Sequence, residues 1–141
     1  MASRAWRALE AAIDRVLANP GAGQCIVADD EDRIVGSVFL YPGGASAYAD
    51  DRVEVHPEFR LLAVAPNARG RGIGRALVDE CIRRATASGA TELGLHTSKS
   101  LATATALYEK MGFTRVPERD FQPDGAELVQ GYRLMLPGAS S

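Results

Sequence analysis

Helical and extended patterns of apolar residues alternate along this chain. Over residues 3–18 and again over 73–88, apolar side chains recur every three or four positions, which predicts two amphipathic helices. Asn19-Pro20-Gly21 ends the first helix, and Gly89 supplies a left-handed cap for the second. Between and after these helices the pattern changes to short apolar runs, which are typical of strands.

Six such runs predict strands at 25–28, 33–40, 58–64, 93–96, 114–116 and 128–136. The acidic turn at 29–32 joins the first two strands into an antiparallel hairpin. A third helix is expected to begin at a side-chain cap from Ser98 or Ser100 and to run to Lys110, with Gly112 as its left-handed end.

The order of these elements predicts the fold class. A strand, a helix and another strand in the middle of the chain imply one parallel pair, whereas the other strands are expected to be antiparallel. The result is an α/β fold of the α+β type, with a mixed, mostly antiparallel central sheet flanked by helices. The 141 residues suit a single domain, residues 1–141. The connection 41–57 is long, and loops of such length often serve function.

Composition narrows the class of protein. Hydrophobic residues make up 46% and charged residues 24%, which excludes a wholly disordered chain. No apolar run reaches the roughly 18 residues of a membrane span, and the charged N-terminus does not resemble a signal peptide, so we expect a cytoplasmic protein without a membrane partner. A net charge of −2 argues against a nucleic-acid partner. Cys25 and Cys81 are too few for a metal site, and buried free thiols are expected.

The segment that carries chemistry is Arg69-Gly70-Arg71-Gly72-Ile73-Gly74, followed by Arg75, between the strand at 58–64 and the helix that starts at 73. A helix N-terminus offers unpaired N–H groups, glycines let phosphate oxygens approach the backbone, and arginines add forked donors. The segment therefore predicts a diphosphate cradle, with a purely structural glycine turn as the alternative. The Rossmann and Walker patterns both fail, because their third glycine and their Lys-Ser/Thr pair are missing here.

Two motifs resemble one known family. Arg69-x-x-Gly72-x-Gly74 is similar to the acyl-CoA-binding signature of the GNAT superfamily of N-acyltransferases, and Ala104-x-x-Leu107-Tyr108 with Gly112-Phe113 resembles that family's second helix. The two matches stand in the family's order and at its usual separation, and the resemblance extends over roughly residues 24–136. It implies a GNAT-like fold whose sheet is splayed at the acyl-CoA site, with acetyl-CoA as the cofactor.

The resemblance also implies which residues bind that cofactor. The backbone of Leu62, Ala63 and Val64 would pair with pantetheine, and an N–H near Leu62 would polarise the thioester carbonyl. The amides of Arg69, Gly70, Arg71, Gly72, Ile73 and Gly74 would hold the pyrophosphate. One of Arg69, Arg71 and Arg75 would reach the 3′-phosphate.

Two residues are candidates for proton transfer. Tyr108 stands where the family places a phenol near the sulfur, so we assign it as the general acid, with a core aromatic as the alternative. Glu58, at the start of the strand at 58–64, is the candidate general base, with a surface charge at a strand end as the alternative. Glu54 is the reserve candidate for the base.

The acceptor side is less well determined by the sequence. The connection 41–57 and the segment 117–127 are expected to form the acceptor pocket, with Tyr48 and Phe121 as walls. An exposed loop histidine is favoured at position 56, and a satisfied structural histidine at position 96, over roles in catalysis. The carboxylates Asp50 and Asp51 would attract a cationic amine or simply face solvent.

The chain departs from the family pattern in two places. Family members usually begin with one strand and one helix more than this chain has, so it looks shortened at its N-terminus. The strand at 24–28 would then form an exposed sheet edge that invites pairing with a second chain as a homodimer. Leu101 stands where the family often has an asparagine that contacts the cofactor.

The sequence therefore predicts an N-acetyltransferase that moves an acetyl group from acetyl-CoA to a primary amine of a small molecule or peptide. The transfer is expected to be direct, within a ternary complex. The alternative is a non-catalytic acyl-CoA-binding or dimerisation module with an incomplete acceptor site. A nucleotide-binding oxidoreductase is disfavoured because its glycine fingerprint is missing.

Overall fold

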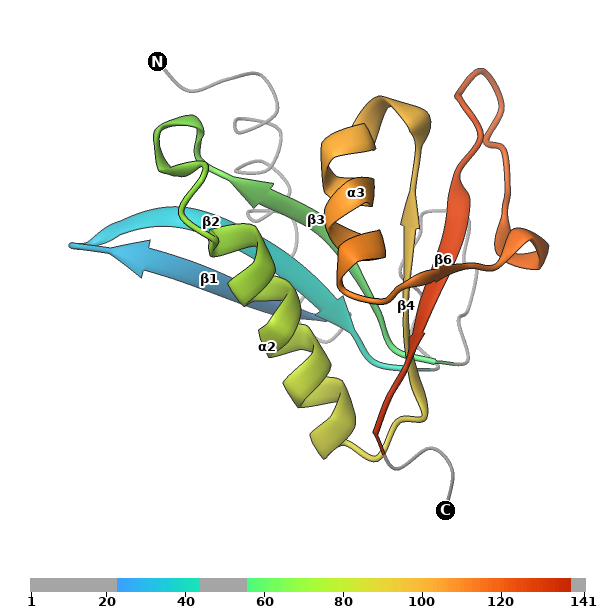
Figure 1. The fold of residues 1–141 in the computed structure, drawn as a ribbon, viewed down its shortest axis with the longest axis horizontal. Helices are drawn as coiled ribbons and strands as arrows, with labels where there is room; N and C mark the ends of the chain where they lie inside the picture. The colour runs from blue at the N-terminus through green and yellow to red at the C-terminus, as the bar shows by residue number, and fades with distance from the viewer. Residues whose placement is uncertain (1–22, 44–55, 138–141) are drawn as a thin grey trace.

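The computed structural model describes residues 23–43 and 56–137, and within them six strands form one mixed sheet (Figure 1). In spatial order the strands run β1-β2-β3-β4-β6-β5. Their bounds are β1 Gln24–Asp30, β2 Arg33–Tyr41, β3 Glu58–Val64, β4 Glu92–Thr97, β5 Thr114–Arg115 and β6 Gln130–Met135. Among these strands β3 and β4 are parallel and all other neighbours are antiparallel, which confirms the predicted fold class.

Two α-helices and three short 3₁₀ turns complete the described part of the chain. The helices are α2 Ile73–Ala87 and α3 Ala102–Lys110, and the turns are η1 Pro66–Ala68, η2 Lys99–Leu101 and η3 Pro117–Arg119. Figure 1 shows α2 and α3 on the same side of the sheet, and side chains from both helices enter one hydrophobic core. No helix in the described ranges combines the length and the apolar character that crossing a membrane requires.

The core lies between these helices and the sheet. On α2 the buried side chains recur at the spacing that the sequence predicted, at Leu77, Val78, Cys81 and Ala85. They pack against apolar residues of five strands and of α3, including Ile26, Val38, Leu40, Phe59, Leu93, Leu95, Tyr108, Phe113 and Tyr132. A glycine at position 36 lets α2 come close to β2, because an added Cβ there would lie 2.8 Å from Ile73 Cγ2.

The start of α3 differs from the prediction. Neither Ser98 nor Ser100 caps it, because a 3₁₀ turn intervenes and the α-helix begins only after Leu101, without a side-chain cap. The Ser100 hydroxyl instead donates to the Glu127 carboxylate. The other helix ends follow the sequence, since Gly89 and Gly112 both have the expected positive φ, at 86° and 101°.

Three further predictions, on the cysteines, the last strand and the first helix, have different outcomes. Cys81 is a buried free thiol as predicted, but Cys25 is only partly buried and lies 3.6 Å from the Ser37 hydroxyl. The last strand begins at Gln130 rather than at 128, because an isolated bridge between Phe121 and Val129 precedes it. The helix predicted at 3–18 lies outside the described residues.

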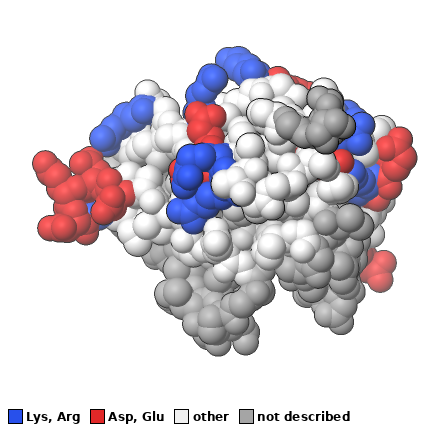
Figure 2. All heavy atoms as spheres, turned by 90° about the horizontal axis from the view of Figure 1, so that it is seen from below, with Lys and Arg blue, Asp and Glu red and all other residues white. Residues whose placement is uncertain are grey.

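Strand β1 forms one edge of the sheet that the described residues build. An exposed edge at this strand and a homodimer through it stay predictions. At the tip of the β1–β2 hairpin the acidic residues 29–32 are exposed, and Figure 2 shows acidic side chains gathered at the left-hand end of the molecule, where this hairpin turns.

Candidate active site

Strands β3 and β4 begin side by side and then separate. Their parallel pairing is confined to the first two residues of β3, Glu58 and Phe59, which face Gly94 and Leu95. Figure 1 shows the two strands diverging beyond that point. Past Phe59, β3 continues its ladder only with β2 among the described strands, so its other edge offers backbone groups to an extended ligand. This opening runs along residues 62–64, which the family resemblance assigned to pantetheine.

A bulge lies in β3 at the opening. Ser37 of β2 faces Ala63, but Phe39 faces Arg60, so β3 carries one residue more than β2 across this stretch. Leu61, within it, adopts a φ of 59°. That left-handed conformation costs a non-glycine residue about 1–2 kcal/mol. Because the Leu61 side chain is 42% exposed, burial offsets little of this cost, and local strain is stored where the strands part.

The turn after β3 has the geometry of an anion cradle. Gly70 and Gly72 have φ values of 81° and 78°, and Gly72 is the N-cap of α2. An added Cβ at either glycine would meet no atom within 4 Å, so the space in front of the turn is open. The Ala76 N–H bonds to the Gly72 carbonyl. The amides of residues 73–75 precede it in the first turn, where a helix supplies no acceptor, and no described side chain caps them.

The three arginines of this turn are exposed, and two of them form no ion pair with a described residue. Arg71 Nη2 donates to Asp30 Oδ2 at 3.1 Å. This pair is solvent-exposed and stabilises the fold by less than about 1 kcal/mol, so an anionic ligand can displace Asp30 at small cost. Arg69 and Arg75 are the two without an ion pair, and they flank the glycines. All three predicted arginines therefore lie exposed within or next to the glycine turn.

Glu58 is buried and hydrogen-bonded rather than a surface charge. Its side chain and that of His96 are each 4% exposed, and His96 Nδ1 lies 2.9 Å from Glu58 Oε1. The other ring nitrogen, Nε2, lies 3.0 Å from the backbone carbonyl oxygen of Arg119. Both ring nitrogens of His96 have a hydrogen-bond partner, as predicted for a structural histidine. One of these partners is the candidate base, Glu58.

A second carboxylate lies beside this pair. Glu92 Oε2 accepts from Arg119 Nη1 at 2.7 Å, and Glu92 Oε1 lies 3.4 Å from His56 Nε2. Burial by itself raises the pKa of Glu92, but the Arg119 hydrogen bond and the charges of Arg119, His56 and Arg133 outweigh it and hold that pKa below its usual value. The residue at position 56 is partly buried against Glu92, so the prediction of an exposed loop histidine was wrong.

Tyr108 lies on α3, on the core side of the opening. Its ring packs edge-on against Phe59 at a centroid distance of 5.5 Å and against Phe113 at 6.0 Å. Burial, with a smaller contribution from Cys81, raises the pKa of Tyr108 to about 12. The phenol therefore keeps its proton at neutral pH, which an acid requires, and the same ring fills the core.

The acceptor side is only partly described. Tyr48, Asp50, Asp51 and Glu54 lie outside the described residues. Phe121 is described, and its ring packs edge-on against the His96 ring at 5.2 Å. The segment 117–127 thus reaches the Glu58–His96 pair, and the acceptor pocket stays a prediction.

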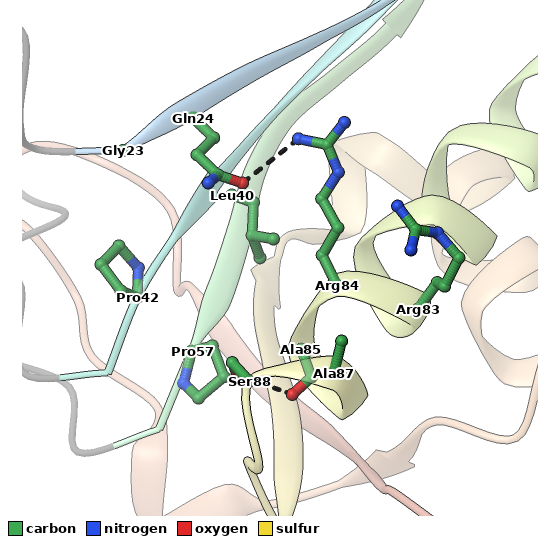
Figure 3. Close-up of a pocket in the computed structure, with 10 residues that line it drawn as sticks. All are labelled: Gly23, Gln24, Leu40, Pro42, Pro57, Arg83, Arg84, Ala85, Ala87 and Ser88. Atoms are coloured by element: carbon green, nitrogen blue, oxygen red, sulfur yellow. Dashed lines mark hydrogen bonds between the residues drawn. The ribbon is translucent and has the colours of Figure 1, made fainter.

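Two cavities lie away from these residues. One, of about 530 Å³, is at the C-terminal end of α2, where Arg84 Nη1 donates to Gln24 Oε1 at 3.2 Å (Figure 3). The other, of about 580 Å³, lies between η1 and the tip of the β1–β2 hairpin. Neither is lined by Glu58 or Tyr108, whereas the second is lined in part by Arg71 of the glycine turn.

A family model described as an acetyltransferase (GNAT) domain matches residues 21–115. The chain belongs to the GNAT family. The match covers the hairpin, the strand β3 with its glycine turn, and the helices α2 and α3, so it includes both motifs that carried the resemblance.

Relatives of this GNAT domain have several acetyltransferase names. A mycothiol acetyltransferase from Geodermatophilus obscurus is 34% identical over 88 residues, which are 61% of this chain and 27% of that protein. An IAA acetyltransferase from Azospirillum brasilense is 38% identical over 86 residues, 60% of this chain and 56% of that protein. The chain thus spans about a quarter to a half of the length of these relatives.

Solved structures agree on the fold. An acetyltransferase of the GNAT family from Desulfovibrio desulfuricans aligns with a TM-score of 0.69 at 23% identity, over 87% of this chain and 76% of that one. A GNAT family acetyltransferase from Elizabethkingia anophelis, whose structure has acetyl-CoA bound, aligns with a TM-score of 0.66 at 22% identity, over 90% and 83% of the two chains.

Sequence reasoning missed Glu92 and Arg119 in this GNAT domain. A signal for the first was present, because polar positions 92, 94 and 96 alternate with Leu93 and Leu95 along β4. That alternation places Glu92 and His96 on one face of the sheet and the leucines on the core face. Arg119 comes from a loop 23 residues beyond His96, and nothing in the sequence near it indicated a contact.

Proposed function

We propose that this GNAT domain transfers an acetyl group from acetyl-CoA to a primary amine of a small molecule or peptide, directly and within a ternary complex. The observation that carries the proposal is the open, left-handed glycine turn at the start of α2, directly after a strand that leaves its neighbour. The acetyltransferase names of the relatives support it, as does the acetyl-CoA bound in the Elizabethkingia anophelis structure.

The cradle is suited to the phosphates of coenzyme A. Amides at residues 69–74 hold the pyrophosphate, where the helix dipole adds a partial positive charge. Arg69, Arg71 or Arg75 takes the 3′-phosphate. The exposed edge of β3 at Leu62, Ala63 and Val64 pairs with the pantetheine arm as an added strand would.

The opening between β3 and β4 then holds the reacting atoms. The amine nitrogen attacks the thioester carbonyl carbon, a C–N bond forms and the C–S bond breaks. An N–H of β3 near the bulge at Leu61 and Leu62 donates to the carbonyl oxygen as negative charge develops there. The bulge supports this assignment because it redirects the backbone at the point where the two strands separate.

Two protons must move for the atoms to balance. Glu58 takes the proton that the amine nitrogen loses, and its position at the end of the β3–β4 pairing supports this role. Tyr108 donates its proton to the departing thiolate, and its raised pKa keeps that proton in place until the sulfur leaves. Phe121, against His96, forms part of the wall on the acceptor side.

Calorimetry with acetyl-CoA tests the cradle. Gly72→Leu should reduce the affinity for acetyl-CoA by at least about 100-fold, because a side chain in a left-handed N-cap displaces the turn and fills its open space. Gly89→Leu is the matched control: Gly89 also has a positive φ and open surroundings, but it lies at the other end of α2. Unchanged affinity in the Gly72 variant would remove the cradle from the proposal.

An acetyl-CoA consumption assay tests the chemistry. A panel of amines that contains peptide N-termini, lysine, polyamines and amino acids should include at least one acceptor that is turned over. Tight binding of acetyl-CoA with no turnover on any class would instead favour the non-catalytic module.

A further inference from the structure

His96 lies between two hydrogen-bond acceptors. A backbone carbonyl oxygen only accepts, so the 3.0 Å contact between Nε2 and the Arg119 oxygen requires a proton on Nε2. With that proton placed, Nδ1 of a neutral His96 ring has only a lone pair. A carboxylate oxygen of Glu58 also has only lone pairs, yet it lies 2.9 Å from Nδ1.

The short contact therefore requires one more proton between the two residues. It resides on Nδ1, which gives an imidazolium and a carboxylate, or on Oε1, which gives a neutral pair. In both cases the pair has a net charge of zero. The fully deprotonated pair would set two lone pairs against each other at 2.9 Å in a place where each side chain is 4% exposed.

The charged groups around the pair are balanced among themselves. From η3 and the residue after it come Arg119 and Asp120, and from β4 comes Glu92. Arg119 is hydrogen-bonded to Glu92, which His56 and Arg133 also approach. Asp120 is bound by the Arg115 guanidinium. Within the described residues each of these charges has an opposite charge beside it, and the imidazolium form of His96 is a cationic partner of Glu58 at 2.9 Å.

We propose that His96 is a positioning residue for the base, and that Glu58 and His96 accept the proton of the acceptor amine as one titrating unit. This inference rests on the proposed acetyl transfer. At rest the unit holds one shared proton and is neutral; after it takes the proton from the amine nitrogen it holds two and has a charge of +1.

Nitrogen NMR of the imidazole rings tests the proton count without any assay of activity. The chain has two histidines, so a His56→Asn variant leaves His96 as the single source of signal. We expect Nε2 of His96 to stay protonated across the pH range of stability. We also expect Glu58→Gln to change the Nδ1 shift, because the shared proton is lost. A neutral ring with its proton on Nδ1, or an Nδ1 shift unchanged by Glu58→Gln, would overturn the inference.

Two replacements of His96 separate positioning from packing. The side-chain amide of His96→Asn lies where Nδ1 lay and still donates to Glu58, whereas that of His96→Gln lies where Nε2 lay and donates to the Arg119 carbonyl. We expect kcat to fall at least ten times further in His96→Gln than in His96→Asn, with the affinity for acetyl-CoA unchanged in both. A merely structural role would give equal losses, and that result would overturn the inference.

The pH profile gives the second readout. In His96→Asn a neutral amide replaces the imidazole, so a proton added to Glu58 yields a neutral site instead of a positive one. The acid limb of kcat should therefore move up by about one to three pH units. His56→Asn is the control and should leave the limb in place. An unmoved limb in His96→Asn contradicts the shared unit. No turnover by the wild-type protein would count against acetyl transfer instead, and the NMR experiment would still report on the pair.

Discussion

At the scale of single residues, Tyr108 combines two roles. Its ring fills the core between Phe59 and Phe113, and its hydroxyl is the proposed proton donor. These roles are compatible because burial, which packing requires, also raises the pKa of the phenol to about 12. An acid with such a pKa keeps its proton at neutral pH.

Replacing Tyr108 by phenylalanine separates the two roles. The ring and its edge-on contacts remain, so the free energy of unfolding should change by no more than about 1 kcal/mol. The value of kcat should fall roughly 100-fold or more, because the sulfur then leaves without a proton donor. Steady-state kinetics and calorimetry with acetyl-CoA measure the two effects.

The matched control is Tyr132→Phe. Tyr132 is also a buried tyrosine, on β6, and its hydroxyl donates to Glu109 Oε2 at 3.4 Å. This variant should retain its kcat. If Tyr108→Phe lost affinity for acetyl-CoA as strongly as it lost turnover, Tyr108 would be a binding residue and not the acid.

The positions of the candidate residues in strands and helices could be predicted, but their contacts could not, and their roles stay proposals. Glu58 and Tyr108 stand at positions that the strand and helix motifs single out. The hydrogen bond from His96 to Glu58 joins residues 38 positions apart, and it depends on the register in which β3 and β4 pair. Alternation along a strand shows which side chains share one face of the sheet. It does not show which residue of the neighbouring strand lies opposite each of them.

At the scale of elements, the sequence predicted both ends of strand β3 but not the bulge inside it. Its bounds, Glu58–Val64, are those expected from the run of apolar residues. The bulge inside it was not predicted, because the left-handed residue is a leucine and neither a glycine nor an asparagine marks the position. Pairing with β2 before and after the bulge, at Arg60 and Ala63, must hold Leu61 in this conformation, because local preference does not.

Substitutions at Leu61 test the bulge. Asparagine tolerates the left-handed region, so Leu61→Asn should stay within about 1 kcal/mol of the wild-type free energy of unfolding. A β-branched side chain is the least tolerant, so Leu61→Val should lose a further 1–2 kcal/mol or so. Urea denaturation followed by circular dichroism measures both.

The neighbouring Leu62 provides the comparison, because it has no positive φ and is partly buried. Leu62→Val should cost about 1 kcal/mol, as a small core truncation does. If Leu61→Val were no worse than Leu62→Val, strain at the bulge would be excluded.

At the scale of the whole molecule, segments distant in the chain converge on the opening between β3 and β4. Strand β3 supplies Glu58 at one end and leads into the cradle at the other, α3 supplies Tyr108, and the loop around η3 supplies Arg119 and Phe121. The order of strands and helices was predictable from periodicity alone. The return of the η3 loop to His96 was not, because it is held by a backbone carbonyl, which has no signature in the sequence.

The same core that holds these elements together also sets how the molecule responds to alkali. Burial raises the pKa of the Cys81 thiol from 9.0 to about 12, and that of Tyr108 from 10.0 to about 12. The unfolded chain therefore releases these protons at a lower pH than the folded one does. Their contribution to stability is complete below pH 9 and is lost as the pH rises from there towards 12.

Each such group lowers the free energy of unfolding by about 1.4 kcal/mol per pH unit above its unfolded pKa, so Cys81 alone should cost about 3 kcal/mol by pH 11. Urea denaturation of the wild-type chain from pH 8 to pH 11 should show this decline, and Cys81→Ala should start from a lower stability but fall less steeply between pH 9 and 11. Equal slopes in the two proteins would mean that the thiol ionises as easily in the folded chain as in the unfolded one. Tyr108→Phe should also flatten the decline, beginning nearer pH 10, because it removes the phenol that ionises more easily in the unfolded chain than in the folded one.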